Sequence, residues 1–144
     1  MKSVVEVEIN APRATVADLF SNPENNTRWM DDVARVEFLG GQPGMPGSTY
    51  RLVPKSGKMV FVATVTARDL PGKASLILDA PNVSVSVEGR FVAAGADRTT
   101  LISEEVFAFK GFFWRVLGMF AGRAIRSAHR RHIEAFKQFA EQRQ

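Results

Sequence analysis

Cysteine is absent from this chain of 144 residues, and histidine occurs only twice. Without cysteine the chain cannot form a disulfide, an iron–sulfur cluster or a thiolate zinc site, and it has no thiol nucleophile. No apolar run approaches the roughly 18 residues of a membrane-spanning helix. The opening stretch MKSVVEVEIN alternates apolar and charged residues, which indicates a strand rather than a secretion signal. We therefore expect a soluble, cytoplasmic protein with no transmembrane segment.

Sequence motifs for catalysis and for phosphate binding are also lacking. The chain contains no Gly-x-Ser-x-Gly nucleophile elbow. The glycine-rich stretch GGQPGMPG lacks the Gly-Lys-Ser/Thr ending of a phosphate loop and leads into a strand, so we interpret it as a hairpin loop. The motifs therefore identify no catalytic residues, and we expect no cofactor.

Positive charge is concentrated near the C-terminal end of the sequence. Residues 110–144 carry eight basic and two acidic groups, whereas residues 1–109 carry eleven and thirteen. A basic helix face can contact nucleic acid, an anionic membrane or a protein partner. Glu134 lies four residues after Arg130, so these two side chains can pair with each other on the helix surface. No aromatic residues that could stack on bases lie among the basic residues of this face. We favour an ordinary solvated face, expect no nucleic acid partner, and leave peripheral membrane contact open.

The length corresponds to a single domain over residues 1–144. After the first strand, Pro12 and Pro23 each suit the start of a short helix. Between residues 33 and 109, short alternating segments separated by Gly/Pro turns are typical of an antiparallel meander. The last 30-odd residues change to a helical period and predict one long helix that crosses the whole sheet. Its apolar side comprises Phe113, Leu117, Ala121, Ala124, Ala128, His132, Ala135 and Phe139.

This order of elements, together with the stretch VEINAPRATVADLFSNPENNTRWMDDVARVEFL, resembles the SRPBCC superfamily, the START-like group of polyketide cyclase/dehydrase and lipid transport proteins. The resemblance covers essentially the whole chain. It implies an α+β helix-grip fold: a curved seven-stranded antiparallel sheet, two short helices after strand 1, and one long C-terminal helix over an apolar cavity. It leaves the activity open, because the superfamily includes lipid carriers, cyclases, hormone receptors and chaperone-binding modules. The matching positions are Ile9, Ala11, Pro12, Val16, Asn22, Pro23 and Trp29.

Candidate ligand-binding residues follow from strand parity and from the helix face, once the fold is taken to enclose a cavity. Tyr50 is an inward polar group that would orient a ligand, as would Ser103 or Glu105. Glu104 and Glu105 are neighbours on one strand, so one of them points inward, and the sequence leaves open which. The complete candidate set is Trp29, Tyr50, Phe61, Leu76, Val85, Val87, Phe91, Glu105, Leu117, Phe120 and Ala124.

The two histidines, His129 and His132, have a spacing that can hold a metal ion on one side of a helix. A third ligand is lacking, because Glu134 falls on the opposite side of the helical wheel. We therefore expect no metal site. The sequence instead predicts a histidine at the edge of the buried helix face that hydrogen-bonds the sheet.

The stretch GFFWRVLGMFAGRAIR permits three interpretations: a membrane segment, a core helix or a lid. It is too short to span a bilayer and contains Arg115. A continuous helix would direct Leu117 and Phe120 inward, and the small residues that follow would leave space beneath them. We interpret the stretch as a lid over the cavity. Gly118 and Gly122 lower its helix propensity by about 1 kcal/mol each, so this end can bend.

These observations favour a protein that binds a small hydrophobic molecule, such as a lipid, an isoprenoid or a polyketide-like compound, as a carrier or sensor. The first alternative is a cyclase- or aromatase-type enzyme that uses the same cavity. The second is a protein-interaction module that uses the basic C-terminal helix. We prefer the non-catalytic binder, and the sequence does not predict the oligomeric state.

Overall fold

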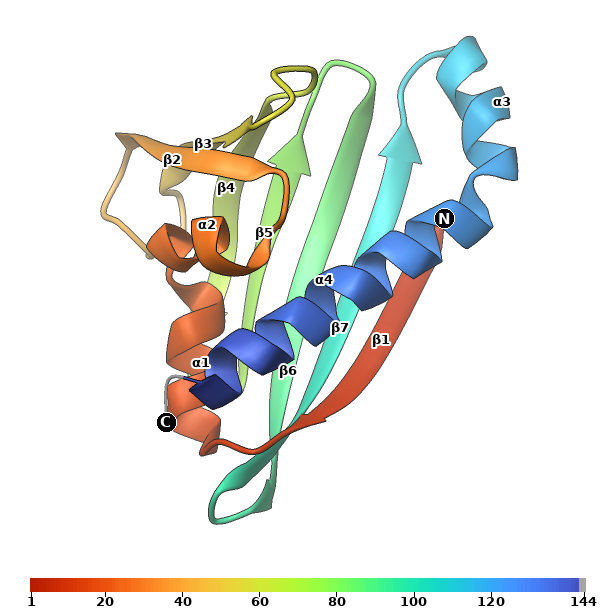
Figure 1. Cartoon of the computed structure of the whole chain (residues 1–144). Helices are drawn as coiled ribbons and strands as arrows, with labels where there is room; N and C mark the ends of the chain where they lie inside the picture. Colours follow the sequence, from red (N-terminus) through yellow and green to blue (C-terminus); the bar gives the residue numbers. More distant parts are fainter. Residues whose placement is uncertain (143–144) are drawn as a thin grey trace.

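Seven antiparallel strands form one sheet in the order β1-β7-β6-β5-β4-β3-β2 in the computed structural model, which describes residues 1–142 (Figure 1). The strands are β1 (Lys2–Ile9), β2 (Val33–Gly40), β3 (Thr49–Pro54), β4 (Phe61–Asp69), β5 (Lys73–Asp79), β6 (Val83–Gly95) and β7 (Arg98–Phe109). The helices are α1 (Arg13–Ser21), the 3₁₀ helix η1 (Pro23–Asn25), α2 (Asn26–Trp29), α3 (Phe112–Phe120) and α4 (Gly122–Gln142). This is the α+β helix-grip arrangement that the sequence predicts.

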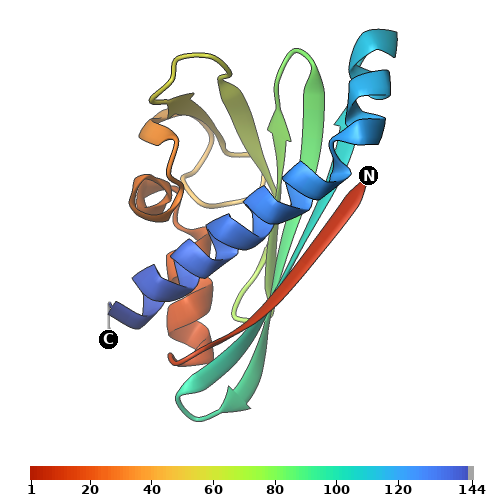
Figure 2. The ribbon, with the colours of Figure 1, turned by 45° about the vertical axis from the view of Figure 1, so that its right-hand side comes forward.

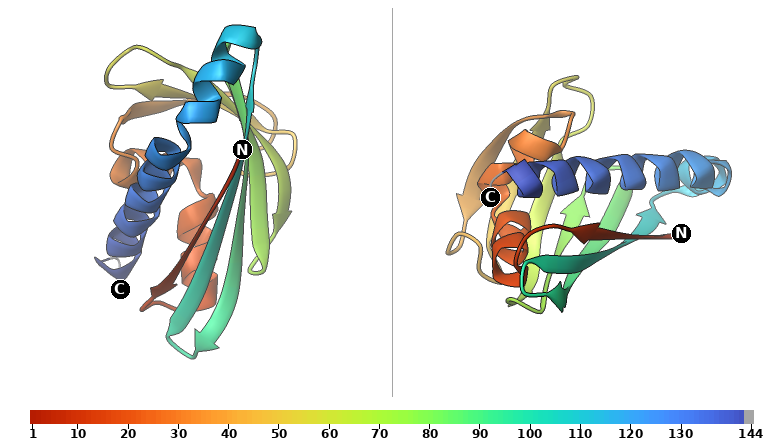
Figure 3. Two further views of the ribbon diagram at one scale, coloured as in Figure 1. Left: turned by 90° about the vertical axis from the view of Figure 1, so that its right-hand side faces the viewer. Right: turned by 60° about the horizontal axis from the view of Figure 1, so that its bottom comes forward.

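The sheet curves around α4, which crosses its concave face diagonally (Figures 1 and 3). In β1 every second side chain is buried, beginning at Ser3 and continuing through Val5, Val7 and Ile9. This pattern confirms the alternation read from the sequence and buries the apolar side chains under the helix. Because Ser3 shares their parity, β1 also directs one hydroxyl toward α4.

Short helices close one end of the concave face. Phe20 of α1 packs directly on β6 at Gly89, where an added Cβ would lie only 2.8 Å from the phenyl ring. The side chain of Asn22 accepts a hydrogen bond from the backbone N–H of Glu24 (3.1 Å) and so caps η1 at the predicted break. Trp29 ends α2 and stacks on Phe20, with ring centroids 5.8 Å apart. The result is an aromatic wall at this end.

The C-terminal half of α4 completes a closed apolar core against this wall. Phe136 is fully buried, and its ring centroid lies 5.1 Å from that of Phe20 and 5.2 Å from that of Trp29. The spacing of three and four residues places the buried side chains on one helix face. The buried residues of α4 are His129, Ile133, Phe136, Phe139 and Ala140.

The single long C-terminal helix predicted from the sequence is two helices, which meet at Ala121. The N–H of Ala121 bonds to the carbonyl of Gly118 (3.3 Å), three residues back, so the last turn of α3 tightens and α4 starts in a new direction. Figure 2 shows α3 at one end of the molecule, beyond the start of α4 and beside the end of β7. The break changes which side of each helix faces the protein.

The sequence predicts that Leu117, Phe120 and Ala124 point inward to the cavity, and because of this break that prediction is wrong. Leu117 is 44% exposed and Phe120 is 82% exposed, and Ala124 also faces solvent. A single helical wheel places these residues inward only if the helix is continuous through Ala121, and it is not. In α3 the residue that meets the protein is Gly118, because only a glycine can come so close to Phe109 on β7.

Candidate functional site

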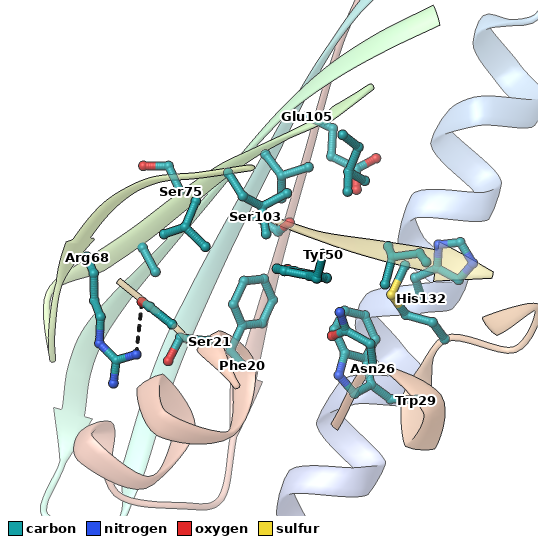
Figure 4. Close-up of a pocket in the computed structure, with 18 of the residues that line it drawn as sticks. Phe20, Ser21, Asn26, Trp29, Tyr50, Arg68, Ser75, Ser103, Glu105 and His132 are labelled. Carbon is teal, nitrogen blue, oxygen red and sulfur yellow. Dashed lines mark hydrogen bonds between the residues drawn. The ribbon is translucent and has the colours of Figure 1, made fainter. Parts of the chain in front are cut away.

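A two-chambered cavity lies between the concave face of the sheet and α4. Its inner chamber is next to the aromatic wall and has a volume of about 70 Å³, room for a few waters. Figure 4 shows its side chains converging from the sheet, from α1 and α2, and from α4. The main lining residues are Phe20, Asn26, Trp29, Tyr50, Val65, Leu76, Val87, Ser103, Glu105, His132 and Ile133.

The outer chamber is larger, with a volume of about 490 Å³, which is within the range of small-molecule sites. It lies under the N-terminal half of α4, where Ile125 and Ala128 form its roof. Lys58 and Met59, from the turn between β3 and β4, bound its outer side. Most of the remaining wall is apolar: Met30, Val33, Leu52, Pro54, Phe61, Leu78, Val85 and Phe107.

Five side chains lie between the two chambers and line both, and they are called the neck below. These residues are Met30, Leu52, Leu78, Glu105 and His132. Met30, Leu52 and Leu78 are apolar, so the polar groups at the neck are the carboxyl group of Glu105 on β7 and the imidazole of His132 on α4. A ligand in the outer chamber would meet these two polar groups at its inner end, and Asp32, Ser56 and Lys58 at its outer side.

His129 joins the helix to the sheet through two serine hydroxyls. Its Nδ1 lies 2.8 Å from Oγ of Ser3 on β1, and its Nε2 lies 2.9 Å from Oγ of Ser103 on β7. All three side chains are fully buried. Burial, with smaller effects of His132 and Arg130, lowers the pKa of His129 to about 4. The neutral ring has one donor and one acceptor nitrogen, so one serine accepts a hydrogen bond from it and the other donates one.

This arrangement confirms the prediction of a histidine that hydrogen-bonds the sheet. Its position is more central than the sequence indicated: His129 is fully buried, whereas His132 is half-buried at the neck. Among the described residues 1–142, no group of three or more histidine, aspartate or glutamate side chains is arranged to hold a metal ion.

Whereas Asp32 lines the outer side of the outer chamber, Glu105 points into the cavity at the neck (Figure 4). Its neighbour Glu104 faces the other side of the sheet, where it lies 3.6 Å from the ammonium group of Lys2. Burial raises the pKa of Glu105 to about 7. The carboxylate oxygen is 3.8 Å from Nε2 of His129, too far for a hydrogen bond. At neutral pH the group is therefore divided between its protonated and ionised forms, and it can donate or accept a proton.

Two further polar groups lie at the inner chamber. The indole Nε1–H of Trp29 is buried and has no hydrogen-bond partner within residues 1–142. Tyr50 is buried on β3, and burial, partly offset by the side-chain amide of Asn26, raises the pKa of its hydroxyl to about 12. Both groups are neutral hydrogen-bonding partners at physiological pH.

The structure brings most of the predicted site residues to the two chambers. Trp29, Tyr50, Leu76 and Val87 line the inner chamber, and Glu105 lines both. Phe61 and Val85 line the outer chamber. Four predicted residues line neither chamber: Phe91, Leu117, Phe120 and Ala124.

The prediction that these four residues line the cavity is wrong for two different reasons. Phe91 has the correct strand parity, but it lies beyond the inner chamber in the closed core, where its ring is 5.6 Å from that of Phe20. Leu117, Phe120 and Ala124 are on the outside because the helix breaks at Ala121, as described above.

Several residues of the cavity were not among the candidates, although strand parity could have identified some of them. Leu52 lies two residues after Tyr50, and Leu78 lies two residues after Leu76, so each shares the inward face of its strand. Ser3, which lines neither chamber but bonds to His129, follows from the alternation of β1 in the same way. Met59 lies between strands, and no periodic signal in the sequence could have placed it at the cavity.

Comparison with known proteins places the whole chain in one group. The family described as polyketide cyclase / dehydrase and lipid transport matches residues 1–141. A comparison with curated proteins finds no match. Among solved structures, the chain is similar to the ZhuI aromatase/cyclase of a Streptomyces species, with 17% identity and a TM-score of 0.78 over 99% of this chain and 94% of that one.

Two other similar structures extend this comparison. A START superfamily protein from Mycobacterium smegmatis has 19% identity and a TM-score of 0.76, over 99% of both chains. Norcoclaurine synthase from Thalictrum flavum has 14% identity and a TM-score of 0.67, over 100% of this chain and 89% of that one. At these identities the structures support the fold, and the family match carries the assignment. The chain belongs to the polyketide cyclase/dehydrase and lipid transport family, within the START-like SRPBCC superfamily that its sequence resembles.

Proposed function

We propose that the chain is a single ligand-binding domain that holds a small, mostly apolar molecule in the outer chamber. The observation that carries this proposal is the chamber of about 490 Å³, whose wall is mostly apolar and which has Glu105 and His132 at its inner end. Apolar walls supply affinity through buried area, and a few placed polar groups fix the orientation of the ligand. The protein would act as a carrier or sensor of a lipid, an isoprenoid or a polyketide-like compound.

The polar groups restrict the chemistry of the ligand. Protonated Glu105 donates a hydrogen bond to a carbonyl or ether oxygen, and ionised Glu105 accepts one from a hydroxyl group. A ligand long enough to pass the neck would also lie against the side chains of Trp29 and Tyr50 in the inner chamber. We therefore expect an apolar molecule with at least one oxygen acceptor, rather than a plain hydrocarbon.

A blocking substitution on β6 tests where the ligand binds. Val85 faces the outer chamber, whereas Val92 on the same strand is 50% exposed. The probe is N-phenyl-1-naphthylamine, a neutral apolar dye whose fluorescence rises on binding. Val85→Trp should weaken dye binding at least tenfold, and Val92→Trp should leave it within twofold. Equal binding by both variants would show that the dye does not occupy the outer chamber.

A cyclase-type enzyme is the second candidate, and it is favoured by the pKa of about 7 of Glu105. In such a reaction the ionised carboxylate would remove a proton from a carbon flanked by two carbonyl groups. The resulting enolate would form a carbon–carbon bond with another carbonyl carbon of the same molecule. The protonated carboxyl group would then return the proton to the new alkoxide, so that Glu105 ends as it began.

The same residue separates the carrier from the enzyme. A linear poly-β-ketone is incubated with the protein and with Glu105→Gln, and the products are identified by mass spectrometry and chromatography. An enzyme should yield a cyclised product that Glu105→Gln fails to form, while the variant still binds the dye within a few fold. Binding of the poly-β-ketone without conversion would support the carrier. Mass spectrometry of any molecule that copurifies with the protein would name its class directly.

A further inference from the structure

Helix α3 presents an unusually apolar surface to solvent. Phe112 is 84% exposed, Phe120 is 82% exposed and Met119 is 78% exposed. Gly118 is the buried residue of this helix. Figures 2 and 3 show the helix projecting from one end of the molecule, away from the body of the sheet. The surface formed by Phe112, Phe113, Val116, Leu117, Met119 and Phe120 is called the α3 apolar face below.

The orientation of this helix is fixed by its contact with β7. A Cβ added at Gly118 would lie 2.5 Å from the ring of Phe109, so a larger side chain cannot occupy this position without moving the helix. The smallest residue of α3 therefore faces the protein, while Phe112, Met119 and Phe120 face outward. Residues three and four apart on a helix lie on one side, so Val116 and Leu117 link the phenylalanines at the two ends of α3 into a continuous stripe.

Unpaired positive charges lie beside the α3 apolar face. Between residues 106 and 133 the chain has six basic residues and no acidic one. Arg115, Arg123 and Arg126 are exposed, and none has an ion-pair partner within residues 1–142. They border the same surface depression as Met119 and Phe120, so charge and apolar surface are adjacent.

We propose that α3 docks the protein on the surface of an anionic lipid bilayer. The phenylalanines would enter the boundary between headgroups and acyl chains, and the three arginines would lie among the lipid phosphates. Within residues 1–142 no helix is long and apolar enough to cross a membrane, so the contact is peripheral. This inference does not rest on the cavity or on its ligand.

Charge argues for a bilayer over a second copy of the chain. A symmetric contact between two α3 faces would bring the three unpaired arginines of each copy together, and like charges at an interface oppose association. An anionic bilayer offers the opposite charge and an apolar layer at the same surface. A bilayer can therefore bury the apolar side chains of α3 and pair the three arginines in one contact.

The test measures binding of the full chain to vesicles by flotation, with phosphatidylcholine alone or with 30% phosphatidylglycerol. We expect at least tenfold tighter binding to the anionic vesicles, and weaker binding at high salt. The variant Phe112→Ser/Phe120→Ser should bind at least tenfold more weakly. The variant Arg115→Gln/Arg123→Gln/Arg126→Gln should lose about a hundredfold, since each basic residue near an anionic surface contributes about fivefold.

Matched controls separate a local effect from a global one. Phe38→Ser changes an exposed aromatic residue on β2, and Arg28→Gln/Lys55→Gln/Lys73→Gln removes the same total charge away from α3. Both controls should bind vesicles like the parent protein. With Trp29 replaced by phenylalanine, Trp114 is the single tryptophan, and its emission should shift to the blue on binding.

Three results would overturn the proposal. One is equal binding to neutral and anionic vesicles. Another is loss of binding in the control variants to the same degree as in the α3 variants. The third is a concentration-dependent dimer in sedimentation that Phe112→Ser/Phe120→Ser abolishes, together with no vesicle binding, which would assign α3 to self-association.

Discussion

Replacing Glu105 by glutamine should stabilise the protein at pH 8 and leave its stability unchanged near pH 4.5. The carboxyl group is buried, with its side chain 19% exposed, and its pKa rises from 4.5 to about 7 on folding. A shift of this size corresponds to about 3 kcal/mol, at roughly 1.4 kcal/mol for each pKa unit. Glutamine has the shape of the protonated acid and never ionises, so it avoids the cost of burying a carboxylate.

The sign of the effect follows from proton binding. Between pH 4.5 and pH 7 the folded protein keeps a proton on Glu105 that the unfolded chain has lost, so this group lowers stability as the pH rises. His129 acts in the opposite direction, because its pKa falls from 6.5 to about 4, and stability is lost as the pH drops across that window. Between pH 4.5 and pH 6.5 the two groups change the free energy of unfolding of the parent protein in opposite directions, so their effects largely cancel. In Glu105→Gln the effect of His129 remains, and stability should rise with pH.

Urea unfolding followed by circular dichroism, at several pH values between 4.5 and 8, measures this effect. The difference in unfolding free energy between Glu105→Gln and the parent protein removes the contributions of other groups, His132 included. It should rise from near zero at pH 4.5 to about 3 kcal/mol above pH 7. A difference that stays constant across this range would refute the reasoning, because it would mean that the carboxyl group is solvated in the folded protein.

Three further substitutions test the packing described above, two by the same unfolding measurement and one by fluorescence. Ser103→Ala leaves one ring nitrogen of His129 without its partner and should cost about 1–3 kcal/mol; no loss would mean that the hydrogen bond is absent. Phe136→Ala removes a fully buried ring and should cost about 3–5 kcal/mol; a loss below 1 kcal/mol would contradict its place in the core. Gly118→Ala places a methyl group against Phe109 and should change the fluorescence of the tryptophan on α3, with little effect on global stability; an unchanged spectrum would show that the helix does not contact the strand there.

Much of the fold could be predicted because it depends on local patterns. In β1 the alternation from Val5 to Ile9 marks the buried face, and the break at Pro23 separates the short helices. The same parity placed Tyr50 and Val85 at the cavity. These residues could be predicted because alternate side chains of a strand point to the same face along its whole length.

The path of the C-terminal helix could not be predicted from local sequence patterns. Gly118 and Gly122 indicated that this region bends, but the position and direction of the bend depend on contact with Phe109, 9 residues before Gly118 in the chain. Once the helix breaks, each half has its own phase, and a single wheel misplaces Leu117 and Ala124. The distinction between Glu104 and Glu105 likewise required the register of β7 against β1 and β6.

The strand order has a consequence for the way the chain folds. β1 lies beside β7 at one edge of the sheet, with Lys2 opposite Val106. During synthesis the first strand must therefore wait, unpaired, until about a hundred further residues have been made, and closing so long a loop slows folding. His129 is made later still, and its ring bonds to Ser3 on the first strand and to Ser103 on the last. The hydrogen bonds of this imidazole can therefore form only after all seven strands have been synthesised, and they then link the first strand to the last.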